Sequence, residues 1–207
     1  MERSSDAHHW DTIYGKYRRD QLGWHAPVLQ TSLNWILKYA ESKNSPIVDI
    51  GGGSSSLVDH LLGHFYSKVT VLDLSQRALD DSANRLGAKA SDVTFVCADI
   101  RDANLFLKPT QIWHDRAAFH FLFGSEVDSY RDRLKKTLAT GGTFILGVFS
   151  ENAPPTCSSL AVNRHSVTGL ERIFSPAFRL LESKIEIHYT PTAIQQEYLY
   201  TAWERLP

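Results

Sequence analysis

The sequence predicts an α/β fold in which a single doubly wound sheet forms one domain. From residue 46 to residue 150, short apolar runs alternate with amphipathic ones. Parallel strands need crossover connections, so this alternation favours a parallel sheet with helices on both faces. Near the end of the chain, residues 178–190 and 195–206 are both β-rich, and only PTAI separates them. Such a gap is too short for a crossover helix, so we expect the last two strands to pair antiparallel at one edge.

Apolar periodicity assigns the elements in order along the chain. The segment SQRALDDSANRLG has clear signals for both ends of a helix, because Ser75 suits the N-cap and Gly87 suits the C-terminal end. The expected helices are 29–40, 55–65, 75–87, 125–140 and 166–174. The expected strands are 46–50, 68–74, 92–100, 111–115, 143–150, 178–190 and 195–206, with a turn at Gly141 and Gly142 before the fifth strand and a loop over 150–159.

Length and composition limit the classes of protein. A chain of 207 residues with 43% apolar residues can bury one sizeable core, so we assign 1–207 to a single domain. The formal net charge of -1 gives no basic field, and no nucleic acid partner is expected. No stretch approaches the ~20 apolar residues of a membrane span, and neither Cys97 nor Cys157 suggests a disulfide framework. We expect a cytoplasmic protein, either a monomer or a homodimer.

A glycine-rich turn, DIGGGSSS, follows the first expected strand. In open α/β sheets, ligands bind at the carboxyl ends of the strands beside the first strand, which is where Gly51, Gly52 and Gly53 fall. Glycine lets the backbone approach a ligand closely and adopt a positive φ. The turn therefore predicts a ligand site, with a tight turn that binds nothing as the alternative.

Three acidic residues, Asp49, Asp73 and Asp99, end the first three expected strands. Any one of them is explained by loop capping, but three in register at successive strand ends are not. A carboxylate after the second strand suits hydrogen bonding to ribose hydroxyls, so Asp73 indicates a nucleoside. Asp99 is placed to accept from an adenine amino group, with Ile100 against the ring edge and Leu74 either bordering the pocket or packing in the core.

Asp49 separates the possible nucleosides. A dinucleotide places an anionic pyrophosphate on the glycine turn, where a neighbouring carboxylate repels it. The dinucleotide pattern G-x-G-x-x-G also requires glycine at position 56, where this chain has Ser56. S-adenosylmethionine has no phosphate and carries an ammonium and a sulfonium, so an acid beside the turn favours it. The turn therefore predicts a cationic nucleoside.

Over roughly residues 10 to 203 the sequence resembles the class I S-adenosylmethionine-dependent methyltransferases. The motifs that carry the resemblance are VDIGGGSSS, VLDLS, CADI, WHDRAAFHFL and LATGGTFIL. The resemblance implies a Rossmann-like sheet of seven strands with an antiparallel last pair. It also implies cofactor contacts by Asp49, Gly51, Gly53, Asp73, Leu74, Asp99 and Ile100. We expect Gly52, Ser55 and His114 to contact the cofactor as well. Ser55 stands where the family has a third alternating glycine.

A weaker likeness, carried by HWDTIYGKY, GWH and WHDRAAFHFL, points to thiopurine-type small-molecule methyltransferases.

Aromatic residues gather in the first 25 positions, which we interpret as an N-terminal lid segment. Tyr14 and Trp24 are the lid candidates, because an aromatic face attracts a sulfonium and excludes water. For Trp10 and Trp35 we favour packing against the sheet.

The end of the fourth expected strand supplies the candidate catalytic residues, His114 and Asp115. Either is a possible general base toward an amine or hydroxyl, and Asp115 has the alternative of an ion pair with Arg116. No metal is expected, because the histidines are scattered and the two cysteines lie far apart in the chain.

These features predict a methyltransferase of class EC 2.1.1 that uses S-adenosylmethionine, yields S-adenosylhomocysteine and acts on a small-molecule nucleophile. A protein lysine or another macromolecule is the alternative acceptor. A nicotinamide-dependent oxidoreductase and a non-catalytic cofactor-binding module are further alternatives, and the former is disfavoured by Asp49 and Ser56.

Overall fold

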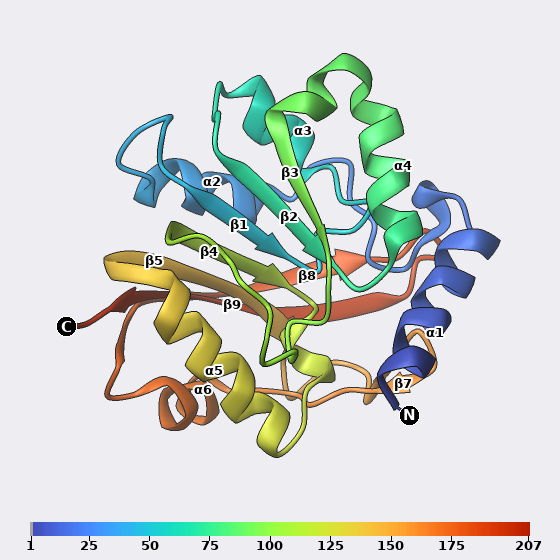
Figure 1. The fold of residues 1–207 in the computed structure, drawn as a ribbon. Coiled ribbons are helices and arrows are strands. Elements are labelled where there is room, and N and C mark those ends of the chain that lie inside the picture. The colour runs from blue at the N-terminus through green and yellow to red at the C-terminus, as the bar shows by residue number, and fades with distance from the viewer. Residues whose placement is uncertain (1) are drawn as a thin grey trace.

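The computed structural model describes residues 2–207, with side chains from Asp6 onward. Met1, the first residue of the predicted lid segment, lies outside the described residues. The chain forms a seven-stranded sheet in the order β3-β2-β1-β4-β5-β9-β8, with helices on both faces (Figure 1). The predicted doubly wound fold and its antiparallel last pair are confirmed.

The first five strands of this sheet run parallel, whereas β9 runs antiparallel to both β5 and β8. The strands are β1 Ile47–Ile50, β2 Val69–Asp73, β3 Val93–Cys97, β4 Thr110–Arg116, β5 Leu138–Phe149, β8 Phe178–Tyr189 and β9 Gln195–Arg205. The carboxyl ends of β1, β2 and β4 therefore meet at one edge of the sheet.

Five of the six α-helices lie where apolar periodicity predicts them. They are α2 Gln30–Tyr39, α3 Leu57–Gly63, α4 Gln76–Leu86, α5 Ser125–Thr137 and α6 Val167–Phe174. Short 3₁₀ turns cover Arg19–Gln21, Gly87–Asp92 and Phe119–Phe121. The hydroxyl of Ser75 accepts from the N–H of Ala78, and Gly87 ends α4 with φ +57°, so the predicted caps are confirmed.

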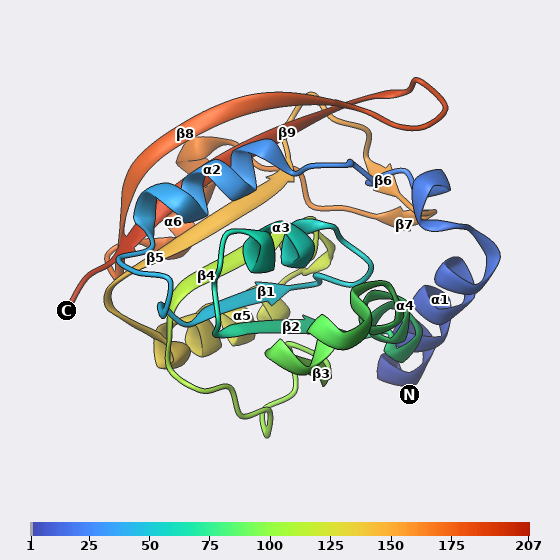
Figure 2. The ribbon, with the colours of Figure 1, turned by 90° about the horizontal axis from the view of Figure 1, so that it is seen from above.

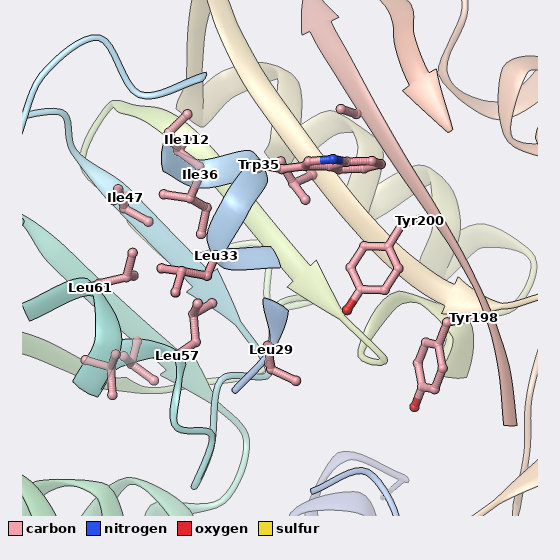
Figure 3. Packing of buried hydrophobic residues seen from close by; sticks show 14 of the residues in the cluster. Leu29, Leu33, Trp35, Ile36, Ile47, Leu57, Leu61, Ile112, Tyr198 and Tyr200 are labelled. Carbon is pink, nitrogen blue, oxygen red and sulfur yellow. The ribbon is translucent and has the colours of Figure 1, made fainter. Parts of the chain in front are cut away.

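Two apolar clusters hold the helices to the sheet, one on each face. Leu33 and Ile36 of α2 and Leu57 of α3 pack with Tyr200 on one face, as Figure 3 shows. On the other face α5 and α6 pack against residues that include Trp113 and Phe144. Successive residues of β1 point into opposite clusters, so this strand is buried on both sides and fixes the position of the turn that follows it.

The N-terminal segment forms a helix, α1 Glu2–Lys16, that apolar periodicity does not predict. It lies beside α4 (Figure 2). Tyr14, Leu22 and Ala78 are buried together there, with Trp10 and Trp24 packed against them. The sequence gives a weak signal because α1 buries a few aromatic residues rather than a continuous apolar stripe.

Two details differ from the sequence-based expectations. The expected loop over 150–159 contains β6 Thr156–Cys157, which forms a hairpin with β7 Leu160–Ala161. Its turn residues, Ser158 and Ser159, have φ of 51° and 65°, so a hairpin forms without the usual Asn-Gly or Gly signal. Gly141 and Gly142 lie inside β5, in an irregular segment where its pairing with β4 shifts, rather than before the strand.

Candidate functional site

A cavity of about 280 Å³ lies at the carboxyl ends of β1, β2 and β4. Residues of α1 and of the β6–β7 hairpin contribute to its walls, so segments far apart in the sequence enclose it. Its lining residues are Asp6, Trp10, Tyr14, Trp24, Ile50, Gly51, Leu72, Asp73, Leu74, Ala98, Asp99, Ile100, Arg101, Arg116, Ala117, Ala118, Phe121, Leu122, Cys157, Leu160 and Ala161. Half of the ten predicted cofactor contacts and both lid candidates, Tyr14 and Trp24, are among them.

The glycine turn is packed so tightly that side chains do not fit. Gly51 and Gly53 have φ of 65° and 41°. A Cβ on Gly52 would lie 2.6 Å from Asp49 Oδ2. A Cβ on Gly53 would lie 2.6 Å from Tyr14 Oη and 2.8 Å from Asp73 Oδ2. The three glycines therefore allow the acids and Tyr14 to approach the backbone of the turn.

Polar side chains from α4 hold the turn in place. Ser82 Oγ donates to the carbonyl oxygen of Gly53 at 2.6 Å, and Arg85 Nη2 donates to that of Ser55 at 2.7 Å. The hydroxyl of Ser55 in turn accepts from the N–H of Leu57 at 3.1 Å. Ser55 thus gives the N–H of the first residue of α3 a hydrogen-bond acceptor, which a glycine at this position cannot supply.

Asp73 ends β2 and is buried at the cavity wall. Its Oδ1 accepts from the N–H of Ser75 at 2.8 Å. Burial, to which the nearby Asp49 carboxylate adds, raises the pKa of Asp73 to about 7. The protein thus holds a carboxylate that any hydrogen-bond donor entering the cavity will stabilise in its charged form.

Asp49 and His114 form a buried pair beside the glycine turn. His114 Nδ1 lies 2.6 Å from Asp49 Oδ1, and His114 Nε2 lies 2.9 Å from Ser32 Oγ. Both residues line a smaller recess of about 30 Å³ together with Gly52 and Ser55. Because both ring nitrogens of His114 have partners, the geometry suits a residue that positions Asp49 rather than one that takes a proton from a substrate.

Asp99, Ile100 and Leu74, which we expect to contact the cofactor, line the main cavity. Arg101 donates from Nε and Nη2 to the Asp99 carboxylate, at 2.9 and 2.8 Å. The same guanidinium pairs with Asp6 of α1 at 2.8 Å and with Glu126 of α5 at 2.6 Å. Arg101, which sequence reasoning missed, ties α1 to the body of the protein at the end of the cavity.

Tyr14 and Trp24 meet edge to face at the cavity wall, with ring centroids 5.8 Å apart. Trp10 contacts Trp24 and Phe121 edge to face, and it also lines the cavity. The sequence favoured a packing role for Trp10, and the structure adds a position at the cavity wall. Trp35 is buried against Tyr200, well inside the core.

Asp115 is fully buried and does not line either cavity. Its oxygens accept from the N–H groups of Ala118 and Phe119 at 3.0 and 3.2 Å and from the hydroxyl of Tyr130 at 2.7 Å. Burial raises its pKa to about 6. These contacts suit a residue that shapes the turn after β4, and the ion pair with Arg116 that the sequence left open does not form.

Arg116 is the buried cation of the site. Its Nε donates to Tyr200 Oη and its Nη1 to the carbonyl oxygen of Trp24, both at 3.0 Å. The guanidinium lies 4.2 Å from the centroid of the Tyr198 ring. Among the described residues its Nη2 has no hydrogen-bond partner. Arg116 lines both cavities, and its Nη2 atom is itself buried.

The contacts of Arg101 predict that it keeps α1 closed over the cavity. In Arg101→Met we expect chymotrypsin to cleave after Trp10, Tyr14 or Tyr17 several times faster than in the unchanged protein, because the pair with Asp6 is lost. S-adenosylhomocysteine should slow this cleavage. The control is Arg18→Met, which removes an exposed ion pair with Asp20. Equal cleavage rates in all three proteins would contradict the lid interpretation.

Among the side chains from Asp6 onward, no group of three or more His, Cys, Asp or Glu residues is arranged to hold a metal ion. No helix in the same part of the chain has the length and apolar character needed to cross a membrane.

Residues 47–142 match the family profile of a methyltransferase domain. No curated protein sequence matches the chain. The whole fold is similar to that of an S-adenosylmethionine-dependent methyltransferase of Anabaena variabilis, with a TM-score of 0.75, 13% identity and coverage of 99% of this chain and 95% of that one.

Two further solved structures share the fold. One is the 1,6-didemethyltoxoflavin-N1-methyltransferase of Burkholderia thailandensis, solved with 1,6-didemethyltoxoflavin and S-adenosylhomocysteine (TM-score 0.71, 17% identity, 99% of this chain and 87% of that one). The other comes from a complex with the Haloferax volcanii Trm112 methyltransferase activator (TM-score 0.73, 16% identity, 98% of this chain and 97% of that one). The match over residues 47–142 places a methyltransferase domain in this part of the chain, and the whole chain has the fold of the class I S-adenosylmethionine-dependent methyltransferases that its sequence resembles.

Proposed function

We propose that this protein transfers a methyl group from S-adenosylmethionine to a small-molecule nucleophile. The observation that carries the proposal is the position of Asp73, a buried carboxylate at the cavity wall, directly beside a glycine turn that has a second acid, Asp49, behind it. This arrangement suits a ribose next to a positively charged group and disfavours a pyrophosphate.

Each part of the cofactor has residues that suit it. Asp73 is placed to accept hydrogen bonds from the ribose hydroxyls, and Asp49 faces the recess where an ammonium would gain a charge partner. Leu74, Ile100 and Leu122 offer apolar contacts to the adenine. When bound, S-adenosylmethionine supplies an activated methyl group whose bond to sulfur breaks as the bond to the acceptor forms, which leaves S-adenosylhomocysteine.

Catalysis by the protein's own residues would then consist of holding the acceptor in line and keeping water out. Trp10, Tyr14 and Trp24 close the cavity with aromatic faces, which favour a sulfonium and exclude solvent. Correct alignment alone is worth about 7 kcal/mol or more. The contacts of His114 and Asp115 support positioning roles, so a nucleophile that arrives deprotonated fits this site best.

The limited size of the site favours a small acceptor over a protein side chain. The acceptor has to enter a cavity of about 280 Å³ whose walls include α1 and the β6–β7 hairpin. Arg116 adds a second preference, since a buried guanidinium with an unused donor favours an acidic group. The Burkholderia structure, which contains a small heterocyclic compound, is consistent with this class of acceptor.

A radiolabelled-methyl screen over thiols, metalloids, amines and a protein extract tests the proposal. Small molecules that carry a carboxylate should be tested beside their amides. We expect transfer to a small acid, with no transfer to the protein fraction. Labelled protein would favour the macromolecular alternative, whereas calorimetric binding of NADH without S-adenosylhomocysteine would favour the oxidoreductase. Binding of S-adenosylhomocysteine with no transfer to any acceptor would favour the non-catalytic module.

Arg116→Gln tests the acceptor side. We expect KM for an acidic acceptor to rise about tenfold or more, because a charge-assisted hydrogen bond is lost in a buried site. KM for the matched amide should change little, and so should the affinity for S-adenosylhomocysteine. If the variant instead loses affinity for S-adenosylhomocysteine but not for 5′-methylthioadenosine, Arg116 binds the cofactor's carboxylate and not the acceptor.

A further inference from the structure

Strand β8 is a long and unprotected sheet edge. It has 12 residues and, among residues 2–207, pairs only with β9 (Figure 2). Sheet edges are usually blunted by proline, by a protruding lysine or by a bulge. No proline lies in β8, and its one irregularity falls between Leu180 and Glu182, near one end. The stretch from Ser183 to Tyr189 is regular and open.

Two backbone hydrogen bonds show which residues of β8 point their N–H and C=O groups away from β9. The N–H of Thr190 donates to the carbonyl of Ile194 at 2.9 Å, so Thr190 faces β9. The N–H of Ser150 donates to the carbonyl of Glu197 at 3.0 Å, so Glu197 faces β5 and its neighbour Tyr198 faces β8. Tyr198 pairs with Glu186, and backbone direction alternates along a strand. Both observations make the backbone groups of Ser183, Ile185 and Ile187 point outward.

The side chains of the edge leave an apolar stripe exposed. Leu181, Ile185, Ile187 and Tyr189 are 38%, 49%, 38% and 63% exposed. The strand's one lysine does not shield them, since Lys184 Nζ donates to Thr31 Oγ1 of α2 at 3.0 Å.

We propose that β8 pairs antiparallel with β8 of a second copy of this chain, about a two-fold axis at Ile185. In this register Ile185 faces itself, Ser183 faces Ile187, and Leu181 faces Tyr189. Each of the first two pairs uses backbone groups that point outward, as an antiparallel ladder requires. The interface is isologous and closes on itself, so it gives a dimer whose sheet continues across the two chains.

Charge supports the same register on the opposite side of the strand. Lys184 faces Glu186 of the second copy, and Glu182 faces His188. Both Lys184 and Glu186 already lie beside Thr31 of their own chain, at 3.0 and 2.5 Å, so little movement is needed. An axis at Ser183 would instead set Arg179 against Ile187, and an axis at Ile187 would leave Lys184 opposite Thr190. Of these three registers, the one centred on Ile185 therefore gives the best match of apolar and oppositely charged side chains.

Light scattering after size exclusion tests the proposal. We expect the unchanged chain to have twice the 23.4 kDa of one copy. Ile185→Lys should have the mass of one copy and a cooperative unfolding transition whose midpoint no longer depends on protein concentration, because association stabilises the folded state. Phe106→Lys is the control, because Phe106 is 79% exposed and lies outside β8. No cavity-lining residue lies on β8, so Ile185→Lys should bind S-adenosylhomocysteine as well as the unchanged chain does. The mass measurement itself does not depend on the methyltransferase proposal.

Charge exchange tests the register itself. Lys184→Glu and Glu186→Lys should each weaken the dimer, because each sets like charges opposite, and the double variant should restore it. In a Cys97→Ser background, Ile185→Cys should give an oxidised, covalent dimer, whereas Phe106→Cys should not. A single-copy mass for the unchanged chain at every concentration overturns the proposal, and so does a dimer that survives Ile185→Lys without cross-linking at position 185.

Discussion

Replacement of Gly53 by alanine should lower the affinity for S-adenosylhomocysteine by about 100-fold or more, close to 2.7 kcal/mol. A Cβ at this position would lie 2.6 Å from Tyr14 Oη and 2.8 Å from Asp73 Oδ2. These are the atoms that we place at the ribose and at the lid. The new methyl group must therefore displace either the turn or its two functional neighbours.

Gly87→Ala is the matched control for this variant. Gly53 and Gly87 both have positive φ, 41° and 57°, so alanine introduces a similar backbone strain of roughly 1 kcal/mol at each position. No atom lies within 4 Å of a Cβ at position 87. We expect both variants to lose some thermal stability, and only Gly53→Ala to lose binding in calorimetry. Equal binding losses would mean that backbone strain, rather than contact with the site, explains the effect.

Replacement of Asp73 by alanine should weaken binding of S-adenosylhomocysteine by about tenfold or more, because the ribose loses a charge-assisted acceptor. The pKa of Asp73, raised to about 7 by burial, adds a pH dependence. Ribose hydroxyls donate to the carboxylate and so stabilise its charged form. The affinity of the unchanged protein should therefore rise with pH up to about 7, by at most about tenfold per pH unit, and then level off.

Stability should change in the opposite direction. A carboxyl group whose pKa is raised by folding binds its proton more tightly in the folded state than in the unfolded state. Its contribution to the free energy of unfolding therefore falls as the pH rises from about 4 to about 7. Asp73→Asn keeps the shape and removes the titration, so both pH dependences should become flatter in calorimetry and in thermal unfolding. Unchanged profiles in Asp73→Asn would assign the titration to another group.

The arrangement of the sheet, and the residues at its strand ends, follow from the sequence because their causes are local. Ser75 and Gly87 bound α4 through contacts within a few residues. Asp73 ends β2 and Asp49 is the last but one residue of β1, so burial of the apolar residues of these strands brings both acids to the same edge of the sheet. The antiparallel pair follows from the short gap between two β-rich runs. These features therefore depend mainly on interactions between residues that are close together in the sequence.

Only the tertiary structure decided which side chains close the site and what each one contacts. Asp6 and Arg101 are 95 positions apart, and Arg116 reaches the carbonyl of Trp24 across 92 positions. His114 and Asp115 are neighbours in the sequence, yet β4 turns one toward Asp49 and the other toward Tyr130. Such contacts depend on where distant segments pack, and a polar helix such as α1 gains its stability from those contacts rather than from its own residues.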